Sequence, residues 1–158
     1  MKESHRIGVS FGFTSAIITT LGLMIGLHSG TNSRLAVLGG ILTIAIADAF
    51  SDALGIHLSE ESERVHTLRE IWEATISTFI AKLFFALTFI IPVIYLDLQL
   101  AMIVSVIWGL LALSFLSYVI AKSNKERVLS VVGEHLFIAI IVIITTHFVG
   151  EWINNTFG

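Results

Sequence analysis

The chain has 158 residues, of which 55% are hydrophobic and only 13% are charged, and its formal net charge is -3 at pH 7. Soluble domains carry about 25% charged residues, and a chain of this length buries only about 70% of its surface on folding, so the apolar excess must face lipid. Composition therefore excludes a soluble enzyme, a nucleic-acid-binding protein (there is no basic tract) and, because cysteine is absent, a disulfide-stabilised secreted domain.

Five apolar runs are long enough to cross a bilayer, which takes about 20 residues in a helix. They cover residues 7–27, 35–58, 71–95, 98–120 and 128–149, and short polar segments separate them. The first run is longer than a signal-peptide core and has no A-x-A cleavage site, so we expect it to be retained. The sequence predicts an all-α integral membrane protein with one five-helix domain over residues 1–158.

The basic residues predict the orientation, because Lys and Arg are retained on the cytoplasmic side of a membrane. One side of the predicted bundle carries only Arg34. The other side carries Lys2, Arg6, Arg64, Arg69, Lys122, Lys125 and Arg127. We therefore expect a cytoplasmic N-terminus and an outside C-terminus, in the cell membrane or, in a eukaryote, a vacuolar-type membrane.

The first run has two GxxxG spacings, one formed by Gly8 and Gly12 and the other by Gly22 and Gly26. Small residues let helix backbones approach closely inside a membrane. Two interpretations remain open: packing within one chain, or packing of this helix against its copy across a two-fold axis. Because five helices are few to enclose a polar path, we favour a homodimer.

Asp48 and Asp52 lie inside the second run. They are four residues apart and so share a helix face, about 6 Å from each other. Two carboxylates this close in a low-dielectric site repel, so one holds a proton unless a cation lies between them. This is what exchange of metal ions for protons requires. The alternative is that both pair with Lys82 and hold two helices together, although one lysine cannot satisfy two carboxylates.

Acidic and imidazole side chains follow the second run. If the second helix continued past this run, helical spacing would place these side chains on the same face as Asp48. However, Thr67–Glu70 has the pattern of a capping box, which starts a new helix. Carboxylate and imidazole ligands suit Mn²⁺, Fe²⁺ or Zn²⁺, whereas the alternative is an ordinary solvated turn partly neutralised by its arginines. We expect metal ions to be collected at this cytoplasmic mouth by Glu63, His66, Glu70 and Glu73.

Lys82 lies about halfway along the third run. Its ammonium could neutralise an aspartate of the second helix and release it when a metal ion arrives; the alternative is snorkelling towards the membrane surface. Glu134 and His135 point about 100° apart on the fifth helix, and we expect Glu134 to be the one that meets a neighbouring helix. Proton coupling is assigned to Lys82 and Glu134. The fourth run has no ionisable residue between Gln99 and Lys122, which indicates a lipid-facing scaffold.

The segments GFTSAIITTLGLMIGL and ADAFSDALGIHLSEESE, within five helices and with a cytoplasmic N-terminus, resemble the vacuolar iron transporter family. The similarity is concentrated in Gly12–Gly26 and Ala47–Glu63. The resemblance implies a dimer that exports Fe²⁺ or Mn²⁺ from the cytosol in exchange for protons, with the first two helices lining the path.

The chain departs from the family pattern at the carboxylates. The family's aspartate of the first helix falls on Ser15, its methionine of the second helix falls on Asp52, and Asp48 takes the place of a glycine. The carboxylates have thus moved from the first helix to the second. The family's cytoplasmic metal-binding insert is reduced to SEESERVHTLRE.

We therefore expect a proton-coupled exporter of Fe²⁺ or Mn²⁺, homodimeric in the lipid bilayer, with no permanently bound cofactor and no nucleic-acid partner. No phosphate-binding loop, Ser/His/Asp arrangement or HExxH motif is present, so an enzyme is not expected. One alternative is a non-transporting scaffold or regulatory subunit with buried Asp–Lys ion pairs. Another is a proton-coupled carrier of a different cation.

Overall fold

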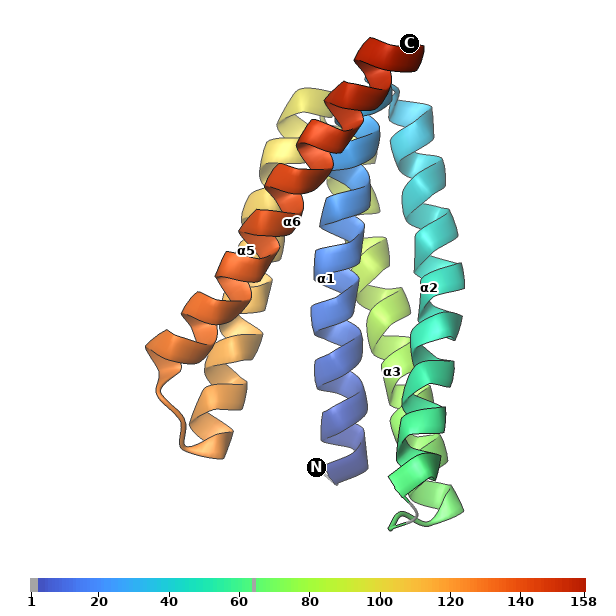
Figure 1. The fold of residues 1–158 in the computed structure, drawn as a ribbon, viewed down its shortest axis with the longest axis vertical. Helices are drawn as coiled ribbons and strands as arrows, with labels where there is room; N and C mark the ends of the chain where they lie inside the picture. Colours follow the sequence, from blue (N-terminus) through green and yellow to red (C-terminus); the bar gives the residue numbers. More distant parts are fainter. Residues whose placement is uncertain (1–2, 64) are drawn as a thin grey trace.

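The computed structural model describes residues 3–63 and 65–158, and it is built from helices (Figure 1). Five segments of this described chain are long and apolar enough to cross a membrane, which confirms the predicted fold class. The first two helices extend beyond the predicted apolar runs at both ends, and the others extend at one end, because adjoining residues continue the helical backbone. They are α1 (Glu3–Thr31), α2 (Arg34–Glu63), α3 (Leu68–Thr88), α4 (Ile90–Tyr95), α5 (Leu98–Asn124) and α6 (Val128–Phe157).

The third span is broken, which the sequence analysis did not predict. It consists of α3 and the short α4, which meet at Phe89. Pro92 has no amide hydrogen and its ring clashes with the carbonyl four residues earlier, so a regular helix cannot run through this point. The far end of α4 is held by Arg34, whose guanidinium donates to the carbonyl oxygens of Val93 and Leu96 at 3.0 and 2.8 Å.

Helix α1 lies at the centre of the bundle (Figure 1). It has α2 and α3 on one side and the α5–α6 hairpin on the other, and the hairpin diverges from α1 towards the end that holds the N-terminus. This end, called the N-terminal end below, also contains the α2–α3 and α5–α6 connections. Arg6, Arg69, Lys122, Lys125 and Arg127 therefore share one end of the bundle, whereas Lys2 and Arg64 lie outside the described residues.

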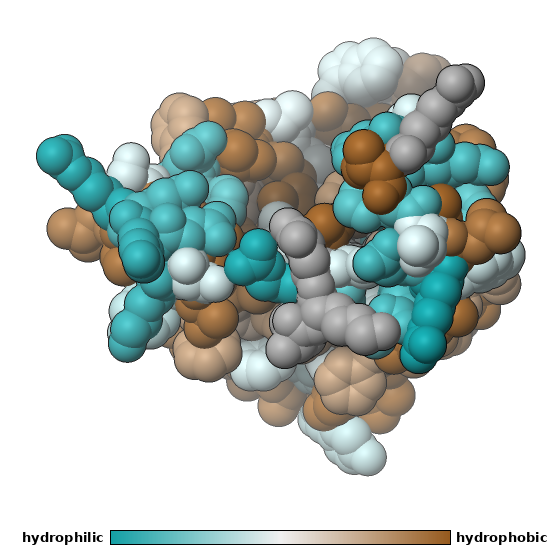
Figure 2. Space-filling model, turned by 90° about the horizontal axis from the view of Figure 1, so that it is seen from below, coloured by the Kyte–Doolittle hydropathy of each residue, from teal (hydrophilic) through white to brown (hydrophobic). Residues whose placement is uncertain are grey.

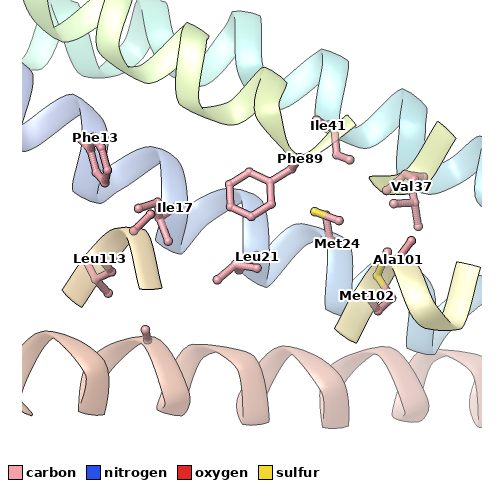
Figure 3. Packing of buried hydrophobic residues seen from close by; sticks show 13 residues of the cluster. Phe13, Ile17, Leu21, Met24, Val37, Ile41, Phe89, Ala101, Met102 and Leu113 are labelled. Atoms are coloured by element: carbon pink, nitrogen blue, oxygen red, sulfur yellow. The ribbon is translucent and has the colours of Figure 1, made fainter. Parts of the chain in front are cut away.

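The apolar core surrounds α1 (Figure 3). Phe13, Ile17, Leu21 and Met24 are buried along α1 and contribute to one cluster with side chains from the other helices. These partners are Val37 and Ile41 of α2, Phe89 and Val93 of the broken span, and Ala101, Met102, Ala112, Leu113 and Ala139 from α5 and α6. Helix α1 thus makes apolar contacts in several directions, whereas α6 leaves most of its side chains exposed.

The two glycine pairs of α1 pack within the chain. A Cβ built on Gly12 would lie 2.5 Å from the Thr78 carbonyl oxygen of α3, and one built on Gly22 would lie 2.9 Å from Val142 of α6. Gly8 meets α3 in the same way, and Gly26 faces Thr146 of α6. The structure therefore assigns these glycines to contacts within one chain. The homodimer stays a prediction that these glycines no longer support.

We expect Gly12→Ala to destabilise the bundle by about 1–3 kcal/mol, because the new methyl group overlaps the α3 backbone. Gly39→Ala is the matched control: a Cβ at Gly39 of α2 meets nothing within 4 Å, and alanine favours a helix over glycine by about 1 kcal/mol. Thermal unfolding in detergent measures both variants. Equal melting temperatures for the two would contradict the close α1–α3 contact.

Candidate functional site

Three helices place polar side chains around Lys82 of α3. Lys82 lies midway along the span Leu68–Tyr95, and only 1% of its side chain is exposed. Its ammonium donates hydrogen bonds to Asp52 Oδ2 of α2 and to Ser15 Oγ of α1, the latter at 2.7 Å. Asp48 Oδ2 lies 2.5 Å from the same nitrogen. One lysine therefore contacts both predicted carboxylates at membrane depth.

The sequence explains how the helices come close enough for these contacts. Gly12 lets α1 cross directly over α3, and a Cβ at this position would lie 3.2 Å from the backbone nitrogen of Lys82. Ser15 is three residues further along α1 and so lies on the same helix face. Ala16, Ala45 and Ala86 pack together from α1, α2 and α3.

The two carboxylates are not held equally. Asp52 accepts a hydrogen bond from Lys82, whereas the buried Oδ2 of Asp48 makes no hydrogen bond, so its contact with the ammonium is electrostatic. The Asp52 side chain is 17% exposed and the Asp48 side chain is 26% exposed. In formal charges, two carboxylates and one ammonium leave one negative charge unbalanced. A second positive charge bound there would balance this excess, and an uncompensated charge is costly in a low-dielectric environment.

Asp48 also borders a groove between α1 and α2. The groove has a volume of about 620 Å³ and runs from Asp48 towards the Arg34 end of α2. Small side chains form much of its α2 wall, since Ala36, Gly40, Thr43, Ala47 and Ser51 line it with Leu23, Leu27 and Ile44. The less satisfied carboxylate is therefore the one with access to open space.

The predicted collecting residues do not form one cluster. His66 Nε2 lies 3.5 Å from carboxylate oxygens of both Glu63 and the buried Glu60. Glu70 instead completes the predicted capping box, where its carboxylate accepts the Thr67 backbone N–H at 2.8 Å. Glu73 accepts from Arg69 Nε at 2.9 Å. Among residues 3–63 and 65–158, no three His, Asp or Glu side chains are grouped closely enough to hold a metal ion.

Two interactions of the α1–α2–α3 unit were not predicted. Ser15 was noted only as the position of a missing aspartate, and its spacing of three residues from Gly12 places the two on one face of α1, which the structure packs against α3. His57 Nδ1 lies 3.0 Å from Thr75 Oγ1, and that hydroxyl donates its hydrogen to the Ile71 carbonyl. Because that hydroxyl hydrogen is already used, His57 Nδ1 is the donor to Thr75 Oγ1.

The expectation for Glu134 is wrong. It is exposed on α6, and its neighbour His135 meets the adjacent helix instead, with Nδ1 2.7 Å from Ser117 Oγ of α5. The polar contacts of Lys82 come from α1 and α2. The structure thus does not bring Glu134 and Lys82, the two residues predicted for proton coupling, together.

We expect Lys82→Ala to destabilise the protein by about 3–5 kcal/mol, because it leaves two carboxylates without their buried partner. n-Propylammonium replaces the deleted atoms and should restore part of the melting temperature. Lys122→Ala is the control, since this lysine is exposed on α5 and its loss should change stability by no more than about 0.5 kcal/mol. Equal unfolding temperatures for the two variants, with no response to the amine, would contradict a bridging Lys82.

The chain matches no protein-family model and no curated protein sequence. The similarity of Gly12–Gly26 and Ala47–Glu63 to vacuolar iron transporters stays a resemblance in motif and predicted topology. The function is therefore argued below from the chemistry of the Ser15–Asp48–Asp52–Lys82 site.

Proposed function

We propose that the protein exchanges a divalent transition-metal ion, Fe²⁺ or Mn²⁺, for protons across the membrane. The observation that carries this proposal is the unequal charge of the site: one buried ammonium faces two carboxylates. Carboxylate oxygens are hard ligands that suit these ions. The resemblance to iron transporters supports the same assignment.

Charge balance supplies a mechanism. With no ion bound, Lys82 carries a proton and one of the two aspartates holds another, so that the site is neutral. A divalent ion that binds Asp48 and Asp52 displaces the ammonium, and both protons leave: the carboxyl proton from the aspartate and one ammonium proton from Lys82. Two protons then move against one divalent ion, and the exchange is electroneutral.

The acidic side chains at the N-terminal end support entry from that side. Glu60, Glu61 and Glu63 end α2, and Glu70 and Glu73 begin α3. A surface field of one sign raises the local concentration of counter-ions without a formed binding site. We assign these residues to attraction of cations, with Asp48 and Asp52 as the ligands.

A structural role is the second candidate, and the burial of Lys82 favours it. The ammonium is almost inaccessible and connects α1, α2 and α3 through three side chains. In a non-transporting scaffold, these contacts would fix the arrangement of the three helices. The unbalanced carboxylate would then serve no purpose, which is why we favour transport.

Flux into liposomes tests the transport proposal. With an imposed pH gradient, we expect Mn²⁺ or Fe²⁺ uptake that a potassium diffusion potential does not alter, because the exchange is electroneutral. Asp52→Asn should reduce this flux by at least about tenfold, as loss of a metal-coordinating contact does. Glu126→Gln, at an exposed position beside α6, should leave it unchanged. No flux from correctly folded protein would remove metal exchange as the favoured function.

Metal-dependent stability separates the two candidates in the absence of flux. A transporter should gain about 2.7 kcal/mol of stability at a Mn²⁺ concentration 100-fold above its dissociation constant. Replacement of Asp48 and Asp52 by Leu together with Lys82 by Met should abolish that gain while leaving the fold intact, since apolar substitution of a whole buried ion cluster is often neutral or stabilising. A scaffold predicts no Mn²⁺ response in either protein.

A further inference from the structure

Charges of opposite sign are separated at the N-terminal end. Figure 2 views this end and shows hydrophilic side chains in two groups, one over the α2–α3 connection and one over the α5–α6 connection. Five glutamates and Arg69 surround the first connection in the described residues. The second has Lys122, Lys125 and Arg127 around Glu126. The transport proposal uses the acidic group and leaves the basic one without a role.

A groove lies between α1 and α5 beside the basic group. It has a volume of about 180 Å³. Its lining is Arg6, Ile7 and Ser10 of α1 with Ile120, Ser123 and Asn124 of α5. The groove thus combines a guanidinium, two hydroxyls and a carboxamide with two apolar side chains.

The polar atoms of this groove suit an anion with several oxygens. Arg6 Nη1 donates to Ser123 Oγ at 3.1 Å, which leaves most of the N–H donors of the guanidinium free for an incoming ligand. Arginine binds phosphate through two parallel hydrogen bonds. Among the described residues that line the groove, none has an acidic side chain.

We propose that the groove binds the phosphate of an anionic phospholipid headgroup. The lipid source follows from the apolar part of the lining: Ile7 and Ile120 continue into the exposed apolar face of α5, where Val119 and Phe115 are 45% and 69% exposed. Acyl chains can lie along this face while the phosphate meets Arg6. Basic pockets between transmembrane helices at the cytoplasmic surface bind anionic headgroups in this way.

The bound lipid would connect two parts of the bundle. The α5–α6 hairpin diverges from α1 at this end (Figure 1), and the Arg6–Ser123 hydrogen bond is exposed. A phosphate that contacts both helices adds charge-assisted hydrogen bonds across the gap in packing. Anionic lipid should therefore stabilise the hairpin against α1, independently of any transport by the Lys82 site.

Native mass spectrometry of delipidated protein in detergent tests the proposal, with phosphatidylglycerol and phosphatidylcholine as probes. We expect one phosphatidylglycerol molecule to bind the wild type with an affinity at least about tenfold higher than that of phosphatidylcholine. Arg6→Gln should lower the affinity of the protein for phosphatidylglycerol by at least about tenfold, because it removes one charge-assisted contact. Arg69→Gln removes the same charge from α3 at the same end and should bind like the wild type. Ser123→Leu, which fills the groove without changing charge, should also lose the lipid.

Melting temperatures distinguish lipid from free phosphate. Phosphatidylglycerol should raise the melting temperature of the wild type and of Arg69→Gln but not of Arg6→Gln, whereas inorganic phosphate should leave all three unchanged. The proposal is overturned if both lipids bind equally, if Arg6→Gln and Ser123→Leu retain phosphatidylglycerol, or if inorganic phosphate alone gives the same stabilisation.

Discussion

The ammonium of Lys82, buried between two carboxylates at membrane depth, is the interaction on which the α1–α2–α3 unit depends. Each of these charges is costly in lipid, and mutual contact lowers that cost only if three helices approach closely. Gly8 and Gly12 let α1 approach α3, and alanines of all three helices pack beside the site. Large apolar side chains of α1, from Phe13 to Met24, extend from this site towards the α4 end of the third span.

The sequence predicts the features that depend on local rules. Hydrophobic run length identifies five spans, the Thr67–Glu70 pattern identifies the start of α3, and the insertion cost of charge identifies Asp48, Asp52 and Lys82 as residues that need partners. The break at Phe89 was also readable from Pro92. Apolar length alone could not show it, because α4 continues the same apolar run after the break.

Predictions failed where the rotation of a helix decides the outcome. Glu134 and His135 are adjacent, and the choice between them depends on which face of α6 meets α5; the partner hydroxyl, Ser117, is 18 residues away from His135. The predicted collecting residues, Glu63, His66, Glu70 and Glu73, fail to form one cluster for a different reason. Glu70 and Glu73 have nearby donors in Thr67 and Arg69, and these local contacts form without the convergence of several elements that a metal site requires.

Asp48 is the part of the site that a structural role does not explain. A single Asp52–Lys82 pair, with Ser15 as a further acceptor, would connect α1, α2 and α3 and leave no net charge. Asp48 adds a buried oxygen without a hydrogen bond, at an insertion cost of at least about 2.5 kcal/mol. It also borders the open groove between α1 and α2. A carboxylate that shares its ammonium with a second carboxylate and borders open space is better matched to a cation that comes and goes than to a fixed partner.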